Sequence, residues 1–315
     1  MKIVHSHVLW LTTIVVLGGC AGGGSGGGGG APNLPVVQPF TSWSAVQPNS
    51  KVPAQGMSQT TAAIFTVAPN GDVTMSSISP FSAVDTSASS ATLTFGASRQ
   101  LTGLQISAPA GSVSWDSTVL GGGTVACGNG VCTASKDSGA SEALTIDPYF
   151  VGWNYQSFGV WQTGSFTSGT FGAMSFGAPT PVSALPLGVT NALYTGLTAG
   201  VYVDATGQLF GTSATMSTTV NFSTRRVDFS TTGTVVSRPS VVGTTPSTGL
   251  NLSGTVVYAP GTAQFVVPVT TANSQLTGSA TGRFYGPAAE EIGGVYSLNG
   301  AGPLQSMGGS FGGKK

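Results

Sequence analysis

The 315-residue chain has little charge and almost no histidine. Charged residues make up 6% of it, ten basic and ten acidic, and the bases are scattered. Without a basic stripe, nucleic acid is not an expected partner. The two histidines, His5 and His7, lie in a segment expected to be removed. The rest of the chain therefore lacks the usual general base and the usual metal or haem ligand, and we predict no metal site and no cofactor.

Two enzyme motifs are also incomplete. The stretch "GGSFG" at residues 308–312 matches the G-x-S-x-G motif, but that motif needs a following helix and a histidine base. A serine–lysine pair is the remaining catalytic alternative. The glycine clusters lack the Gly-Lys-Ser/Thr ending of a phosphate-binding loop. We therefore predict no catalytic residue and no enzyme.

Hydrophobic runs are missing except at the start. Residues 1–19 hold a lysine and an apolar run from Val8 to Leu17, too short to span a bilayer as a helix, which predicts a signal peptide. The ending "LGGC" resembles the bacterial lipoprotein signal, which implies that Cys20 becomes the first residue and carries acyl chains such as palmitate. Ala21 follows it where aspartate would suggest inner-membrane retention, so outer-membrane lipid is the expected anchor. The alternative is an ordinary signal with an incidental Cys20.

Residues 20–31 add a glycine-rich stretch, "AGGGSGGGGG", with no side chain large enough to pack. Such a coil reaches about 35 Å when extended and typically spans about 17 Å. It predicts a tether that holds a folded body off the membrane.

Cysteine is scarce too, with three in the chain. If Cys20 carries lipid, Cys127 and Cys132 remain, flanking a Gly-Asn-Gly turn. A tight turn brings two strand positions together, so we predict a disulfide formed on an oxidising export route. A redox pair and a metal site are the alternatives, although the spacing is not CxxC and histidine is absent.

Helical periodicity is absent, and an apolar period of two dominates. In residues 209–222, "LFGTSATMSTTVNF", the even positions form one apolar face and the odd positions a polar face, as in a half-buried strand. Eight or nine such strands follow residue 149, beginning with "WNYQSFGVWQTG" and "GTFGAMSFGAPT". An antiparallel sheet of that size tends to close, because closure removes exposed edges. "QLTGSATGRF" would line its interior with these residues: Leu276, Gly278, Ala280, Gly282 and Phe284.

The fold class predicted is therefore all-β, with an eight-stranded antiparallel closed β-barrel over residues 149–315. Residues 32–148 hold shorter strand candidates separated by Pro, Asn-Gly and Ser runs, and predict a smaller β-rich, handle-like domain before it. Arg225 and Arg226 fall in a hairpin turn, solvated or touching a partner. A cluster of aromatics near the first barrel strand is expected in the core, with partner anchoring as the alternative: Trp153, Tyr155, Phe158 and Trp161.

The stretch "RFYGPAAEEIGGVY", residues 283–296, holds adjacent carboxylates in a chain with few. Pro287 suits the first position of a helical turn, and Gly293, followed by Gly294, can end it in a left-handed conformation. We therefore predict a strand, a short helical turn and a strand. Neighbouring carboxylates on one turn diverge, which disfavours a catalytic pair. One of Glu290 and Glu291 is expected to cap or pair locally, with Arg283 as a candidate, and the other to be solvated.

The string "GRFYGPAAEEIGGVYSL", followed by "GGSFGGKK", closely resembles the C-terminal barrel of the transferrin-binding protein B family, which includes neisserial heparin-binding antigen and factor H-binding protein. The resemblance extends over roughly residues 149–315. It implies a surface-exposed lipoprotein with an eight-stranded barrel and a β-rich handle. Transferrin-binding protein B has two such lobes with long, charged ligand loops, whereas this chain has the length of one lobe and short, neutral loops. The resemblance therefore assigns no binding residue.

The predicted function is that of a lipid-anchored surface protein of the outer membrane that binds a host protein or a nutrient of the iron- or haem-carrier type. A TonB-dependent receptor or a Slam-type translocon would be a fitting partner. One alternative is a barrel that holds a small ligand, such as haem or a lipid, at one mouth. Another is an integral outer-membrane β-barrel, since the same alternation could face lipid.

Overall fold

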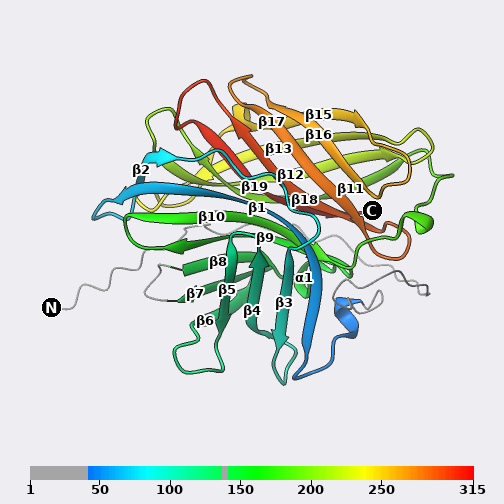
Figure 1. Cartoon of the computed structure of the whole chain (residues 1–315), viewed down its shortest axis with the longest axis horizontal. Coiled ribbons are helices and arrows are strands. Elements are labelled where there is room, and N and C mark those ends of the chain that lie inside the picture. Colours follow the sequence, from blue (N-terminus) through cyan, green and yellow to red (C-terminus); the bar gives the residue numbers. More distant parts are fainter. Residues whose placement is uncertain (1–41, 137–140) are drawn as a thin grey trace.

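The computed structural model describes residues 42–136 and 141–315, which form two antiparallel sheets (Figure 1). The predicted signal peptide over residues 1–19, Cys20 and the tether to residue 31 lie outside the described residues. Short helices connect the strands: η1 (Trp43–Ala45), α1 (Pro148–Val151), η3 (Val182–Ala184) and η4 (Thr248–Leu250). No helix in the described ranges is long and apolar enough to cross a membrane.

The first sheet has ten strands in the order β5-β4-β3-β1-β10-β9-β8-β7-β6, with β2 paired to β1 beside this path. The sheet curls into a nearly closed barrel. It stays open because its end strands, β5 and β6, are not paired over the described residues. The bounds are β1 (Lys51–Val67), β2 (Val73–Ile78), β3 (Ser90–Phe95), β4 (Leu101–Ala108), β5 (Gly111–Asp116), β6 (Thr124–Gly128), β7 (Val131–Lys136), β8 (Ser141–Ile146), β9 (Gln156–Gly164) and β10 (Ser168–Gly177).

The second sheet is a closed barrel. Its order is β12-β11-β19-β18-β17-β16-β15-β13-β14, and an additional pairing of β12 with β13 closes eight strands, leaving the short β14 outside. The predicted all-β fold with an eight-stranded closed barrel is confirmed. The bounds are β11 (Ala192–Val203), β12 (Leu209–Asn221), β13 (Arg226–Ser237), β14 (Thr245–Pro246), β15 (Leu252–Val257), β16 (Gln264–Thr271), β17 (Thr277–Tyr285), β18 (Glu291–Asn299) and β19 (Ser306–Lys314).

Side chains fill the interior of this barrel, as its strand number leads one to expect. Along β12 the burial alternates, with Thr212, Ala214, Met216, Thr218 and Val220 inside, as predicted. Aromatic rings dominate the packing, and the ring centroid of Phe284 lies 5.0 Å from that of Phe222. Other rings of the same cluster are Tyr194, Phe229, Tyr258, Phe265, Tyr296 and Phe311.

The prediction that "WNYQSFGVWQTG" and "GTFGAMSFGAPT" open the barrel is wrong. These residues form β9 and β10, which pair with each other, with β8 and with β1 in the first sheet. Both strands are buried on both faces: Trp161 and Met174 belong to the core of the first sheet, and Phe158 and Ala173 face the barrel. The last strand of the first sheet ends at Gly177 and the first strand of the second sheet begins at Ala192. The boundary between the two sheets therefore lies between these residues and not at residue 149.

The two sheets pack closely, with the barrel above β1, β9 and β10 and the strands β3 to β8 below them (Figure 1). The aliphatic face of β11 points out of the barrel, so Ala199 and Val201 pack against the first sheet. Glycine permits the approach at β19: a Cβ on Gly308 would lie 2.1 Å from the ring of Phe81. Hydrogen bonds also cross the junction, among them Ser310 Oγ to the Gly159 carbonyl at 2.7 Å.

Candidate functional site

A groove opens at one end of the first sheet, beyond its apolar core. The strand β1 pairs with β3 only over Lys51–Gln55 and with β2 over Ala63–Val67, so its far half extends past the residues that β3 to β5 cover. The groove has a volume of about 640 Å³. Its walls come from β1, β2, β9 and β10 and consist mostly of small or hydroxyl-bearing residues: Ala62, Ala63, Ile64, Ser77, Ser79, Thr163, Gly164, Ser165, Ser168, Gly169 and Thr170.

A second hollow of about 300 Å³ adjoins the first and shares Thr163 and Gly164 with it. Its other walls are Ser112, Val113, Ser114, Lys136 and Ser141. We call these two hollows together the handle groove. Lys136 is the single charged residue among its walls, and Ile64 is an apolar wall residue that remains 56% exposed. The groove can therefore contact apolar groups and hydrogen-bond to neutral polar groups.

Glu291 lies at the junction of the two sheets and is fully buried. Its carboxylate accepts hydrogen bonds from the backbone N–H groups of Asn154, Tyr155 and Gln156, at 2.6, 2.9 and 2.9 Å. Burial raises the pKa of Glu291 to about 7, although these three bonds and Lys314 act in the opposite direction. Glu291 therefore ties β18 of the barrel to the start of β9, and the predictions of a local cap or a solvated side chain do not describe it.

The predicted pairing of Arg283 with a glutamate is also wrong. Along β17 the side chain of Phe284 points into the barrel, so that of Arg283 points out, toward the first sheet. Arg283 is 2% exposed and donates from a terminal nitrogen to the Thr86 carbonyl at 2.7 Å. Burial lowers the pKa of its guanidinium. Its role is to hold the loop between β2 and β3 onto the barrel.

The connection between β17 and β18 is a tight turn and not the predicted helical turn. Left-handed backbone occurs at Gly286 (φ +89°) and Ala289 (φ +56°), on either side of Pro287. Glu290 caps this turn, since its carboxylate accepts the Ala288 N–H at 2.9 Å.

Gly293 and Gly294 lie within β18, so the predicted left-handed Gly293 is wrong. A Cβ on Gly294 would lie 2.1 Å from the Thr281 carbonyl oxygen. The two glycines therefore serve close packing and not the turn.

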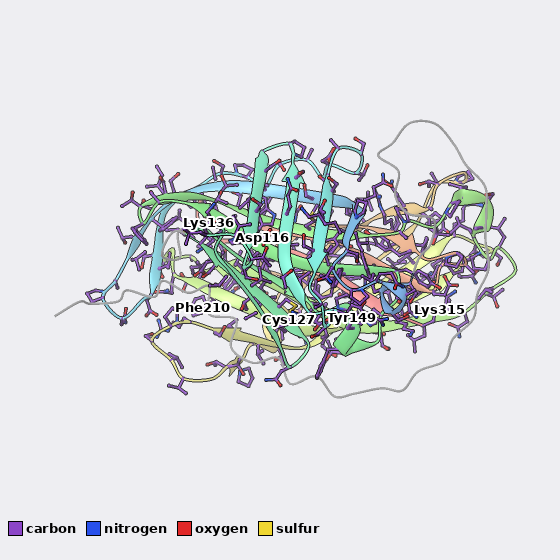
Figure 2. All side chains as sticks on the ribbon, turned by 90° about the horizontal axis from the view of Figure 1, so that it is seen from below. Asp116, Cys127, Lys136, Tyr149, Phe210 and Lys315 are labelled. Carbon is purple, nitrogen blue, oxygen red and sulfur yellow. A yellow bond between two sulfur atoms is a disulfide. The ribbon has the colours of Figure 1, made fainter. Side chains whose placement is uncertain are left out.

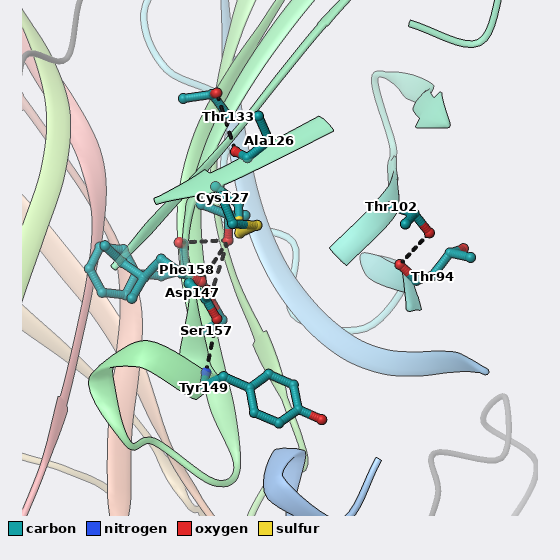
Figure 3. The surroundings of a disulfide bond; sticks show 12 residues. Thr94, Thr102, Ala126, Cys127, Thr133, Asp147, Tyr149, Ser157 and Phe158 are labelled. Atoms are coloured by element: carbon teal, nitrogen blue, oxygen red, sulfur yellow. Dashed lines mark hydrogen bonds between the residues drawn. A yellow bond between two sulfur atoms is a disulfide. The ribbon is translucent and has the colours of Figure 1, made fainter. Parts of the chain in front are cut away.

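Cys127 and Cys132 form a disulfide that closes the β6–β7 hairpin (Figure 3). Asn129 and Gly130 at its tip both have positive φ, as the Asn-Gly sequence favours. The Asp147 carboxylate lies within 4.8 Å of both sulfurs. It caps α1 by accepting the Tyr149 N–H at 3.0 Å, and the sulfurs are bonded to each other, so we assign no metal to this group.

The remaining predicted residues have structural positions. All four of the clustered aromatics are buried, which matches the prediction of core packing: Trp153, Tyr155, Phe158 and Trp161. Arg226 pairs with Asp228 at 2.8 Å on the surface, and Arg225 donates to the Tyr258 carbonyl at 3.2 Å. Ser310, the serine of "GGSFG", is fully buried in β19 with its hydroxyl bonded to Gly159. It is not placed as a nucleophile.

Comparison with solved structures finds several of transferrin-binding protein B. That of a Trp-176-Ala mutant from Haemophilus parasuis has a TM-score of 0.42 at 13% identity, covering 80% of this chain and 59% of that one. That of the isotype 1 protein from Neisseria meningitidis has a TM-score of 0.41 at 16% identity, covering 78% and 53%. This chain thus spans little more than half the length of either. No curated protein matches it.

The sequence itself also matches a family model, described as the C-lobe and N-lobe beta barrels of Tf-binding protein B, over residues 188–315. The matched range begins four residues before β11 and contains every strand of the second sheet. It leaves out residues 149–187, in agreement with the place of β9 and β10 in the first sheet. The resemblance carried by "GRFYGPAAEEIGGVYSL" is thereby confirmed: the chain is transferrin-binding protein B-like, and its closed barrel is similar in sequence to the barrels of that protein.

Proposed function

We propose that this protein is a lipid-anchored lipoprotein of the outer-membrane surface that captures a protein partner, from a host or carrying a nutrient such as iron or haem. The observation that carries the proposal is the pairing of a transferrin-binding protein B-type barrel with an open groove in the first sheet. The barrel is filled with side chains, so recognition falls to surfaces outside it. The two sheets act as handle and barrel domains of one body.

Anchoring is proposed from the start of the sequence. In this view the signal peptide over residues 1–19 is removed, acylated Cys20 inserts into outer-membrane lipid, and the tether to residue 31 lets the body stand away from the membrane. A Cys20→Ser variant should lose its lipid and pass from the membrane fraction to the medium or periplasm. Metabolic labelling with a palmitate analogue measures this directly.

The handle groove is the proposed contact for the partner. Solved relatives are named for transferrin binding, and for this chain a host iron carrier is one member of the proposed class. A TonB-dependent receptor or a Slam-type translocon would serve uptake or export. The groove's neutral, hydroxyl-rich walls favour a partner surface of low charge with apolar side chains that reach Ile64.

A capture experiment tests the proposal. The chain from residue 21 onward is immobilised and exposed to serum and to haem-protein fractions. Ile64→Asp, in the groove, should abolish capture, whereas Val257→Asp, on the outer barrel wall, should preserve it. Ile64 and Val257 are a matched pair, because both are β-branched aliphatic residues and their exposed fractions are 56% and 60%. Failure of the unmodified protein to capture anything would count against the function, and equal loss in both variants would count against the groove.

The two alternatives receive less support. A small ligand inside the barrel would have to displace its aromatic core, so only a mouth is available. For an integral barrel the outward side chains should be apolar where lipid touches them. On the free wall of this barrel most of them are polar instead, with Val257 and Val266 as exposed exceptions: Ser213, Thr215, Ser217 and Thr219 on β12, Asp228 and Ser230 on β13, and Ser253 and Thr255 on β15.

A further inference from the structure

One mouth of the barrel holds an ammonium group against aromatic rings. The Lys315 Nζ lies 5.5 Å from the ring centroid of Tyr194 and 5.5 Å from that of Phe222. Both rings belong to a larger cluster, because Phe284 contacts Tyr194, Phe222 and Tyr258 at centroid distances of 6.3, 5.0 and 5.9 Å. Cations are attracted to the faces of aromatic rings at such distances, and the attraction grows when water is excluded.

Polar groups complete the surroundings of this ammonium. Lys315 Nζ donates to the Ala288 carbonyl at 3.2 Å, and its backbone N–H donates to the Glu290 carbonyl at 3.1 Å. Partial burial lowers the pKa of Lys315, and the charge of Glu290 acts against this. The mouth thus offers two ring faces, one carbonyl oxygen and a nearby carboxylate, all of which favour a positive charge.

The turn between β17 and β18 supplies this polar side and is fixed in place. Tyr194 Oη donates to the Ala289 carbonyl at 2.6 Å, and Glu290 caps the turn through the Ala288 N–H. The left-handed Gly286 and Ala289 direct the intervening carbonyl groups. The Gly-Pro-Ala-Ala-Glu-Glu stretch therefore places carbonyl and carboxylate oxygens beside the aromatic rings of the mouth. A turn that only connects two strands does not require this arrangement.

We propose that this mouth is a binding site for a small organic ammonium compound, of the alkylammonium or choline class, and that Lys315 is its intramolecular occupant. The ligand would displace the Lys315 side chain and place its own charged group between Tyr194 and Phe222. The butylammonium group of lysine and a tetramethylammonium head are close in size and carry the same charge. In Figure 2, Lys315 lies toward the end of the molecule opposite to Phe210, which is near the start of β12. The inference does not depend on the proposed protein partner.

The test uses the full chain with Lys315→Ala, which vacates the site. Choline and tetramethylammonium are titrated by calorimetry and by NMR, together with 3,3-dimethylbutan-1-ol, the uncharged carbon analogue of choline. We expect Lys315→Ala to bind choline at least about tenfold more tightly than the unmodified protein, and to bind the uncharged analogue at least about tenfold more weakly than choline.

Further variants distinguish a site that binds cations from an apolar cavity that binds any ligand of the same size. In the Lys315→Ala background, Phe222→Leu removes one ring face and should weaken choline binding about tenfold, whereas Phe229→Leu, at a barrel ring that packs against Phe311, should bind choline as before. In the unmodified protein, saturating choline should move the NMR chemical shifts of the Lys315 side chain, whose ammonium lies over two rings, to the values of a lysine in water, because the side chain is released.

Three results would overturn the proposal. These are no choline binding by folded Lys315→Ala at millimolar concentration, equal affinity for choline and its uncharged analogue, and unchanged chemical shifts of the Lys315 side chain in the unmodified protein at saturating choline. The first would show that Lys315 only covers the mouth. The last applies even if Lys315→Ala does not fold.

Discussion

The second sheet closes on itself through the β12–β13 pairing, whereas the first ends with β5 and β6 unpaired over the described residues. Closure satisfies every strand edge and leaves an interior that side chains fill, so the barrel offers its ends and outer wall alone. The open sheet leaves part of its inner face uncovered, and that part is the handle groove. The comparison teaches that the segment with the family match is the closed one, and that the recognition surface proposed here lies mainly outside it.

The largest expected effect is on the barrel core. Phe284 is fully buried and its ring contacts four others, so Phe284→Ala leaves a cavity and should lower the free energy of unfolding by about 3–5 kcal/mol. Urea unfolding followed by tryptophan fluorescence measures it. Because the tryptophans of the described residues lie in the first sheet or pack against it, a shift of their transition would show that the two sheets unfold together. An unchanged tryptophan transition would instead separate them.

The junction between the sheets is the next target. Glu291→Ala leaves the N–H groups of residues 154–156, two of them buried and one partly buried, without an acceptor and should cost about 3 kcal/mol. Glu290→Ala is the matched control, because Glu290 is half-buried and caps only its own turn. It should cost about 1 kcal/mol or less. Equal losses in the two variants would contradict the role of Glu291 as the tie between the sheets.

The same residue predicts a pH dependence. Burial raises the pKa of Glu291 to about 7 from 4.5, so the folded protein holds this proton where the unfolded chain has lost it. The contribution of Glu291 to stability is therefore fully present below about pH 4.5 and falls as the pH rises to 7, by about 3 kcal/mol. Urea midpoints from pH 4 to 8 measure the slope. Glu291→Gln does not titrate and should flatten it.

The disulfide ranks below these, because it pins only the hairpin next to the open edge. Replacing Cys127 and Cys132 together with alanine should cost about 2 kcal/mol, as expected for a short closed loop. The unmodified protein treated with a reductant should show a similar loss. A loss above that of Phe284→Ala would mean that the open sheet, and not the barrel, limits stability.

Much of this fold could be predicted from the sequence because its signals are local. The alternation along β12 depends on residues within that strand, and the Asn-Gly tip between Cys127 and Cys132 depends on four residues. The prediction for β9 and β10 is wrong because burial on both faces removes the alternation that would indicate which sheet they join. The environment of Glu291 was beyond prediction, since its partners lie about 135 residues away. The handle groove has no sequence signature, because serine and threonine occur throughout the chain.

The smallest expected effect is on the outer wall of the barrel. Arg226 and Asp228 form an ion pair at 2.8 Å, but their side chains are 55% and 40% exposed. Water and salt screen such a pair, and ordering two long side chains opposes it, so Arg226→Ala should leave the urea midpoint of unfolding almost unchanged. Raising the salt concentration should shrink even that difference. Asp228 would keep its bond from Thr255 Oγ1 at 2.6 Å, which further limits the loss. A clear drop in the urea midpoint would show that this wall is not merely solvated, and would move the search for a partner from the handle groove to the barrel.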